Sequence, residues 1–239
     1  MLKMFSLSME ECIFSRAKGL LGEAAMGRMR QMRVIIFGVG GVGSWCAESL
    51  VRTGVHRLTI VDSDVVCASN VNRQMMATTK TIGRVKVDAL KERLLEINPD
   101  AQIDSVHKMY TAETADEFRL EDYDYIIDAI DSINDKMLLM MRACETDAVF
   151  FSSMGAARKL DSSRISVAEF WKVKGCPLGA TLRRKFRASG TFPKKKFKCV
   201  YSDEQPSACV EGGLGSLHHI TAVFGLMIAG MVIGDICGR

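Results

Sequence analysis

The chain has 239 residues and a formal net charge of +4, with 48% hydrophobic and 25% charged residues. This is the composition of an ordinary soluble globular protein, and the length fits one α/β domain with an appended segment better than two independent domains. None of the eight cysteines forms a C-x-x-C pair, which argues against a zinc ribbon. Glu10 and Glu11 interrupt any early apolar run, which argues against a signal peptide, so we expect a cytoplasmic protein with reduced thiols.

Strand and helix patterns alternate along most of the chain. Residues 1–32 are expected to form a docking segment, residues 33–169 a nucleotide-binding domain, and residues 170–239 a basic segment and a C-terminal helix that complete the same domain. Strands are predicted at 34–37, 57–62, 101–106, 123–128, 148–152 and 164–170, and helices at 42–50, 84–97, 111–120, 135–144 and 220–234. This alternation predicts a Rossmann-like, doubly wound α/β fold with a mostly parallel sheet and a C-terminal extension.

A glycine-rich turn follows the first predicted strand. Gly38, Gly40 and Gly43 have the G-x-G-x-x-G spacing, and the helix that follows would point its N-terminus at a bound phosphate. Asp62 lies 19 residues after Gly43 at the end of the second strand, where such folds place an acid on ribose hydroxyls. The turn indicates a nucleotide, but its spacing alone is equally compatible with a nicotinamide or flavin dehydrogenase.

The loop at residues 63–83 is unusually long and polar, which favours a functional role. It carries Arg73, and Lys86 follows near the start of the next helix. Two cations beside a glycine turn suit a triphosphate that releases pyrophosphate better than they suit NAD. The alternative is a solvated loop with incidental charges.

Two carboxylates, Asp128 and Asp131, end the fourth predicted strand. Side chains at the carboxyl end of a parallel strand face the ligand crevice, where Asp131 could hold Mg²⁺ against phosphate oxygens. The alternative is that Asp131 or Ser132 caps the following helix.

Between Phe170 and Ser202 the chain has ten Lys or Arg residues and no acid, which indicates a polyanionic partner. Phe186, Phe192 and Phe197 interrupt the basic residues, so this segment could bind RNA phosphates and stack on an unpaired base. The alternative is a solvated loop anchored by buried phenylalanines.

Three other features of the C-terminal region bear on function. Cys199 follows a basic run whose cations would lower its pKa, and the competing interpretation is a structural cysteine. His218 and His219 have no metal-ligand partner at useful spacing, which favours a capping or core role. The uncharged run from 220 to 234 is shorter than the roughly 20 residues of a membrane-spanning helix, so we interpret it as a core helix.

Taken together, these motifs resemble the adenylation site of the ubiquitin-activating-enzyme-like superfamily that includes ThiF, MoeB and HesA. The resembling segments are Gly38–Ser44, Asp62 with Asp64, Asn72–Gln74, Lys86 and Asp128–Asp131. Further segments resemble the tRNA threonylcarbamoyladenosine dehydratase branch of that superfamily: Phe14–Gly22, Arg52–Gly54, Ile97–Pro99, Val200–Ser202 and the run at Gly215 and Ser216. The carrier-activating branches typically hold a zinc ion with two C-x-x-C pairs, which this chain lacks.

The resemblance implies that residues 33–169 form an adenylation domain that uses ATP and Mg²⁺. The implied reaction is the ATP-dependent dehydration, or cyclisation, of threonylcarbamoyladenosine in tRNA through an acyl-adenylate. The implied catalytic residues are Arg73, Lys86, Asp131, which also holds the metal, and Arg16, which reaches the neighbouring subunit of a homodimer. The implied nucleotide-binding residues are Gly38, Gly40, Gly41, Gly43, Asp62, Asp64, Asn70 and Gln74.

Besides tRNA and a second copy of the chain, a cysteine desulfurase or sulfur acceptor is an expected partner, and a membrane is not. The main alternative function is adenylation of the C-terminal carboxylate of a ubiquitin-like sulfur-carrier protein. A nucleotide-binding scaffold without catalysis and an NAD-dependent dehydrogenase are further alternatives.

Overall fold

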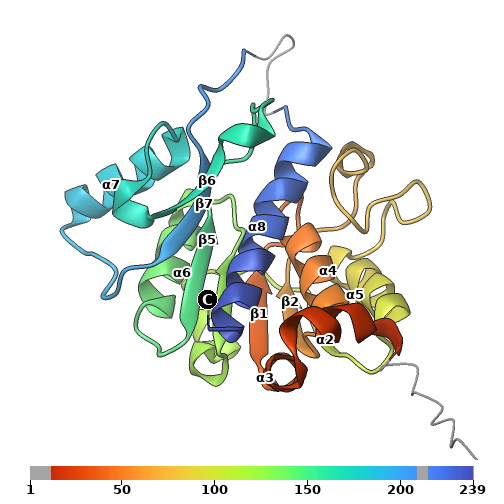
Figure 1. The fold of residues 1–239 in the computed structure, drawn as a ribbon. Coiled ribbons are helices and arrows are strands. Elements are labelled where there is room, and N and C mark those ends of the chain that lie inside the picture. The colour runs from red at the N-terminus through yellow and green to blue at the C-terminus, as the bar shows by residue number, and fades with distance from the viewer. Residues whose placement is uncertain (1–11, 209–214, 239) are drawn as a thin grey trace, which may run out of the picture.

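A seven-stranded sheet forms the centre of the computed structural model, which describes residues 12–208 and 215–238 (Figure 1). The strands are β1 (Arg33–Phe37), β2 (Arg57–Val61), β3 (Gln102–Val106), β4 (Tyr125–Asp128), β5 (Val149–Ser153), β6 (Ile165–Glu169) and β7 (Lys198–Ser202). Their order is β3-β2-β1-β4-β5-β7-β6, and only β6 runs antiparallel to its neighbour. The expected Rossmann-like, mostly parallel α/β fold is confirmed.

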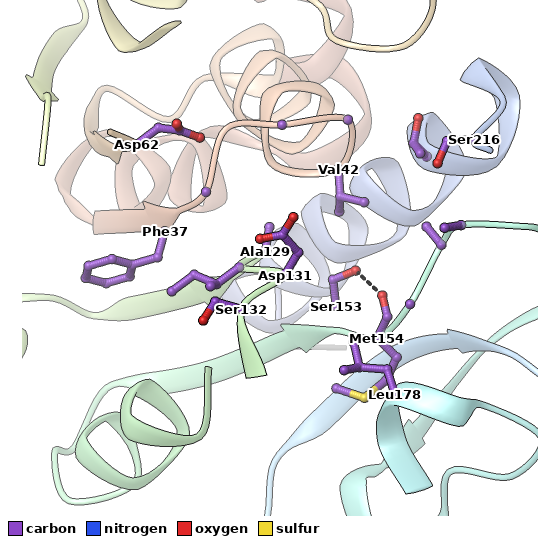
Figure 2. A pocket seen from close by; sticks show the side chains of 18 of the residues that line it. Phe37, Val42, Asp62, Ala129, Asp131, Ser132, Ser153, Met154, Leu178 and Ser216 are labelled. Carbon is purple, nitrogen blue, oxygen red and sulfur yellow. Dashed lines mark hydrogen bonds between the residues drawn. The ribbon is translucent and has the colours of Figure 1, made fainter. Parts of the chain in front are cut away.

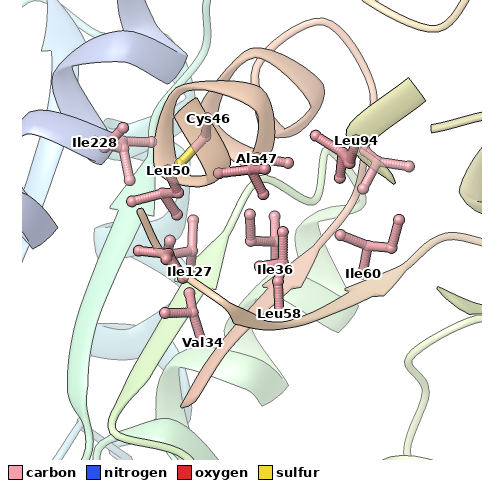
Figure 3. Close-up of a cluster of buried hydrophobic side chains, with 14 of the residues drawn as sticks. Val34, Ile36, Cys46, Ala47, Leu50, Leu58, Ile60, Leu94, Ile127 and Ile228 are labelled. Carbon is pink, nitrogen blue, oxygen red and sulfur yellow. The ribbon is translucent and has the colours of Figure 1, made fainter. Parts of the chain in front are cut away.

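The central strand β1 is buried on both faces of the sheet. Val34 and Ile36 point into the core on one face, whereas Ile35 and Phe37 point into the core on the other. A parallel strand covered on both sides is apolar at successive positions, which explains the unbroken β-branched and aromatic run in the sequence. Figure 3 shows the first of these two cores, in which Ala47 and Leu50 of the helix after β1 face Ile36 and Ile127 of the sheet.

Helices cover both faces of the sheet (Figure 1). The first core is covered by α3 (Glu23–Gln31), α4 (Gly43–Thr53), α5 (Lys86–Ile97) and α8 (His218–Ile236). The second is covered by α6 (Ile133–Ala143) and α7 (Pro177–Ser189), and the short helix α2 (Ser15–Leu21) precedes α3. The C-terminal helix therefore packs beside the first helices of the chain.

A glycine allows α8 to approach α4 very closely. A Cβ atom on Gly225 would lie 2.4 Å from the carbonyl oxygen of Val42 and 2.9 Å from the amide nitrogen of Cys46. Because Val42 belongs to the glycine-rich turn, α8 directly supports the backbone of that turn. α8 is the one described helix that is long and apolar enough to span a membrane, but half of its apolar window is buried inside the protein.

The predicted helix at 111–120 is wrong. The chain there forms two short 3-10 helices, Ala115–Phe118 and Leu120–Asp122, separated by Arg119 in a left-handed conformation with φ of 45°. The hydroxyl of Thr114 accepts from the amide of Thr111 and donates to the carbonyl of Met109, so its side chain closes a local turn where a regular helix was expected to begin.

The basic segment contains two elements that the sequence reading did not predict. α7 begins after Cys176, has Pro177 in its first turn and ends at Gly190, which adopts φ of 69°. Leu182 and Phe186 are buried on its inner face, and β7 then enters the sheet between β5 and β6. Residues 170–202 are therefore an integral part of the fold, not a solvated loop.

Candidate nucleotide site

A cavity of about 620 Å³ opens at the carboxyl ends of the central strands (Figure 2). The chain segments that follow β1, β2, β4 and β5 all line it, and the N-terminus of α7 closes its far side. The strand order reverses between β1 and β4, which is where open α/β sheets bind their ligands.

The glycines of the turn have two different functions. Gly38 adopts φ of +84°, and a Cβ there would lie 2.7 Å from the Ala129 carbonyl oxygen. A Cβ on Gly43 would lie 1.9 Å from the carbonyl oxygen of Gly38, so Gly43 is needed for the turn to close and does not itself line the cavity. Gly40 and Gly41 do line the cavity, where the lack of a side chain leaves their backbone open to a phosphate.

An acidic pair holds the buried Lys86 at the cavity wall. The Lys86 ammonium lies 2.7 Å from Oδ2 of Asp64 and 3.9 Å from Oδ1 of Asp62. Asp62 also accepts from the amides of Val39, at 2.8 Å, and Asp64, at 2.9 Å. Asp62 therefore ties the glycine turn to the end of β2 and fixes the cation next to both.

Arg73 and Gln74 reach the cavity from the long loop after β2. The Arg73 Nη1 donates to the carbonyl of Ser69 at 2.8 Å and to Asn72 Oδ1 at 3.0 Å, while the Arg73 carbonyl accepts from the Trp45 indole at 2.9 Å. Gln74 is 7% exposed, and its Oε1 has no hydrogen-bond partner within the described part of the chain. An unpaired buried amide of this kind is suited to bond a ligand.

Asn70 lies outside the cavity lining. Its Oδ1 accepts from the amide of Cys67 at 3.1 Å and so closes the short 3-10 turn that precedes Arg73. Asn70 therefore shapes the loop through a local contact. The structure does bring the other predicted residues together around one cavity: Gly38, Gly40, Gly41, Asp62, Asp64, Arg73, Gln74, Lys86 and Asp131.

A buried ion pair under the cavity fixes the backbone that carries Asp131. Lys136 and Asp128 are both fully buried, with 2.8 Å between Nζ and Oδ2. Lys136 also donates to the carbonyl of Ile130 at 2.9 Å, and Asp128 accepts from the Ile130 amide at 3.0 Å and from the Ser152 hydroxyl at 2.6 Å. Asp131, one residue on, is exposed and points into the cavity (Figure 2).

Lys136 was not predicted from the sequence to belong to the site. The signal that could have identified it is its position on α6, because Leu139, Met140 and Ala143 share its buried face. A lysine on an otherwise apolar helical face requires a buried partner, and Asp128 provides that partner.

The wall opposite the glycine turn was also not predicted. Arg158 lines it with φ of 61°, and its Nε donates to the carbonyl of Ser207 at 2.7 Å. Lys159 beside it is buried and donates to the Glu204 carbonyl, and burial lowers the pKa of Lys159. These bonds connect the loop after β5 to the segment after β7 and complete the cavity.

A model of the ThiF family matches residues 14–239. The chain belongs to the ThiF family. The family assignment agrees with the geometry of the site, because most of the residues that resemble the superfamily's adenylation site line the cavity.

Relatives of this ThiF-family chain are similar over most of its length. The tRNA threonylcarbamoyladenosine dehydratase of Bacillus subtilis (strain 168) is 40% identical over 81% of this chain and 75% of its own length. The protein of the same name from Escherichia coli (strain K12) is 31% identical over 90% of this chain and 89% of its own length. Crystal structures of the E. coli enzyme, TcdA, in complex with AMP and with ATP have TM-scores of 0.90 and 0.89 at 30% identity, covering 95% of both chains.

Two further candidate residues, Arg16 and Cys199, do not line the cavity of the chain. Arg16 is exposed on α2 and is not among the residues that line the cavity. Cys199 is completely buried in β7, where burial raises the pKa of its thiol well above the usual value. The expectation of a lowered Cys199 pKa is therefore wrong, because loss of hydration outweighs the nearby cations.

The two histidines at the start of α8 make packing and hydrogen-bond contacts. The ring of His218 packs 4.7 Å from that of Trp45, and Nε2 of His219 lies 3.0 Å from the Leu160 carbonyl oxygen. Within residues 12–208 and 215–238, no group of three His, Cys, Asp or Glu side chains is placed to hold a metal ion by itself.

Proposed function

We propose that this ThiF-family protein is an ATP-dependent tRNA threonylcarbamoyladenosine dehydratase. The observation that carries the proposal is one cavity lined by the glycine turn, Arg73, Lys86 and Asp131. The chain also covers most of the length of three bacterial relatives that bear that name, at 31–40% identity. Two cations and a carboxylate next to a phosphate-binding turn suit cleavage of a triphosphate.

The reaction needs activation because a carboxylate is a poor electrophile. The threonyl carboxylate attacks the α-phosphorus of ATP and pyrophosphate leaves, which gives an acyl-adenylate. The ureido group of the same modification then attacks the activated carbonyl, AMP leaves and the ring closes, so the nucleoside loses one water. Because ring closure is intramolecular, the protein's main contribution to this step is to orient the substrate.

We assign the nucleotide roles from positions around the cavity. The amides of Gly40 and Gly41 bind phosphate oxygens, and Asp62 accepts from the ribose hydroxyls. Arg73 and Lys86 stabilise the negative charge on the departing pyrophosphate, and Lys86 is already held for this by Asp64.

The carboxylates at the cavity fit an Mg²⁺ ion shared with the triphosphate. Asp131 and Asp135 both line the cavity, and Mg²⁺ is commonly bound by one or two carboxylates plus substrate phosphates. Such an ion supplies charge neutralisation when bound, and Asp131 is the residue that we assign to hold it.

We further propose that the protein is a cytoplasmic homodimer in which residues 12–32 dock on the neighbouring subunit; residues 1–11 of the expected docking segment lie outside the described residues. Support comes from exposed apolar side chains on α2 and α8: Leu20 is 74% exposed and Leu226 is 46% exposed. Arg16 would then enter the partner's cavity from α2. This would explain why Arg16 does not line the cavity of its own chain. A sulfur-acceptor protein remains a proposed partner.

The decisive experiment supplies the protein with ATP and tRNA that carries threonylcarbamoyladenosine. Mass spectrometry of the digested nucleosides should show loss of one water that depends on ATP, together with release of AMP and pyrophosphate. If AMP forms instead only with a carrier protein that ends in Gly-Gly, the protein is a carrier-activating enzyme and the proposal is wrong.

A further inference from the structure

We propose that Phe192, supported by Trp171 and carried by a chain segment rich in exposed basic residues, is a stacking site for an unpaired base of the RNA substrate. This inference rests on the proposed function, because it assumes that the substrate is an RNA. It adds a second contact site, outside the nucleotide cavity.

Of the three phenylalanines that interrupt the basic residues, only Phe192 is available to a ligand. Phe186 and Phe197 are buried, at 0% and 5% exposure, and belong to the second core. Phe192 is 48% exposed, and its ring lies 5.8 Å from that of Trp171. Trp171 in turn packs against Phe170 and Phe186, and the Arg187 guanidinium lies 5.9 Å from its ring centre.

The backbone holds Phe192 in a fixed place. Gly190 ends α7 in the left-handed conformation, and the Ser189 hydroxyl bonds that of Thr191 at 2.8 Å and accepts from the Thr191 amide at 3.3 Å. Pro193 follows and restricts Phe192 to extended conformations. A ring that is exposed and yet fixed loses little freedom when a base stacks on it.

Some basic residues of the segment at 170–202 have a structural contact, and others are available to a ligand. Lys195 donates to the carbonyls of Thr146 and Ala148, and Lys194 pairs with Glu145 at 2.9 Å. In contrast, a second group is exposed and makes no ion pair within the described part of the chain. This group consists of Lys172, Lys174, Arg184, Arg187, Lys196 and Lys198.

The stacking site and the nucleotide cavity are connected by α7. Pro177 and Leu178, at the N-terminus of α7, line the cavity, whereas Phe192 lies just beyond its C-terminus. At 1.5 Å per residue the helix is roughly 20 Å long, which a few unpaired nucleotides can span. α7 lies on the opposite side of the molecule from α2 (Figure 1), so RNA bound here leaves the proposed docking segment free.

RNA explains this combination better than an acidic protein does. Exposed cations alone would serve any polyanion, but an exposed ring among them suits bases, which stack on aromatic side chains when they are unpaired. A flexible loop of a tRNA would therefore place its modified nucleotide in the cavity and a neighbouring base on Phe192.

The test compares variants in binding to an anticodon stem-loop that carries threonylcarbamoyladenosine. We expect Phe192→Ala to weaken binding about tenfold and Phe192→Trp to restore it, since stacking depends on the ring. Arg187→Ala with Lys196→Ala should lower the slope of log K against log salt concentration by about 1.4, because two phosphate contacts are lost. Arg33→Ala with Arg57→Ala, at the starts of β1 and β2, is the charge-matched control and should leave the slope unchanged.

Three results separate the possible outcomes. Equal RNA binding by Phe192→Ala and the native chain overturns the stacking site. In a second outcome, polyglutamate competes with the stem-loop as strongly as a single-stranded RNA of equal charge does, and Phe192→Ala has no effect. This outcome shows a general polyanion-binding surface and also overturns the stacking site. In a third outcome, the native chain binds the RNA in a way that depends on the Phe192 ring but does not dehydrate threonylcarbamoyladenosine. This outcome would overturn the proposed function and leave the stacking site in place.

Discussion

Arg73 combines two properties that are usually found in different residues. Its guanidinium is held by Ser69 and Asn72, yet it lies at the edge of an open cavity. A cation that is oriented before the ligand arrives loses little entropy on binding and can act on charge that develops late in the reaction.

We therefore expect Arg73→Ala to lower substrate-dependent ATP–pyrophosphate exchange by roughly 10³-fold. The free energy of unfolding should change by about 1 kcal/mol or less, because the lost hydrogen bonds are near the surface. Arg73→Lys keeps the charge but not the planar fork, and should have an intermediate rate. Exchange at the native rate in Arg73→Ala would remove this residue from the mechanism.

The cysteines show how burial controls thiol chemistry at the residue scale. Cys12 and Cys67 are exposed, whereas Cys46, Cys144 and Cys199 are buried. Burial raises the pKa of Cys46 and Cys199 well above the usual value and raises the pKa of Cys144 to about 11. A raised pKa means that the thiolate fraction at pH 8 is very small for these three residues.

Iodoacetamide at pH 8 should thus label Cys12 and Cys67 in the native protein and leave Cys46, Cys144 and Cys199 unmodified. Increasing the pH towards 9 should not change that pattern, because the pKa values of Cys46, Cys144 and Cys199 are raised above this range. Peptide mass spectrometry after a short reaction measures the labelling. Rapid modification of Cys199 in the folded protein would show that it is accessible and reactive after all.

At the scale of elements, the glycine turn depends on α8 as much as on α4. The close approach at Gly225 places α8 against the carbonyl of Val42, a residue that lines the nucleotide cavity. An apolar C-terminal helix that resembles a membrane segment by composition is in this protein a support for the phosphate-binding backbone.

Gly225→Ala should destabilise the protein by about 1–3 kcal/mol, since the new methyl group overlaps backbone atoms that cannot move away easily. The same variant should weaken ATP binding, because the glycine turn must shift. Gly230→Ala is the matched control on the same helix: a Cβ there meets no atom within 4 Å, and the change should stabilise by up to about 1 kcal/mol. Urea unfolding and ATP titration measure both effects, and equal stability of the two variants would contradict this account.

Elements with strong local patterns could be predicted from the sequence. The strand before Gly38 is apolar at every buried position, and the α5 helix has apolar residues at helical spacing, so both were found. β7 and α7 were missed because the basic residues obscured their short apolar patterns. The paired Lys136 and Asp128 lie on different elements, and their contact depends on the packing of α6 against β4.

At the scale of the whole molecule, the position of Arg16 determines how many chains make one active site. Arg16 lies on α2, and the cavity of the same chain is lined without it. If Arg16 acts in the neighbouring subunit, each site of the dimer combines residues from two chains, as closed two-fold symmetry allows.

Mixing two inactive variants tests this directly. Arg16→Ala and Arg73→Ala should each be inactive alone, but a mixed dimer keeps one site with a native Arg73 and a native Arg16 from its partner. Random assortment should restore about a quarter of the native activity. No recovery after subunit exchange, verified by native mass spectrometry of the mixed dimer, would place Arg16 in its own chain's mechanism or outside the mechanism.

The two tryptophans provide separate optical reporters for the two ligands. The Trp45 indole donates to the Arg73 carbonyl and packs on His218, so its fluorescence should respond when ATP engages the Arg73 loop. Trp171 supports Phe192 and should respond to RNA instead. With Trp171→Phe, emission from Trp45 alone would follow ATP, and with Trp45→Phe, emission from Trp171 alone would follow RNA. The order in which ATP and RNA bind could then be measured by stopped flow without attaching a dye.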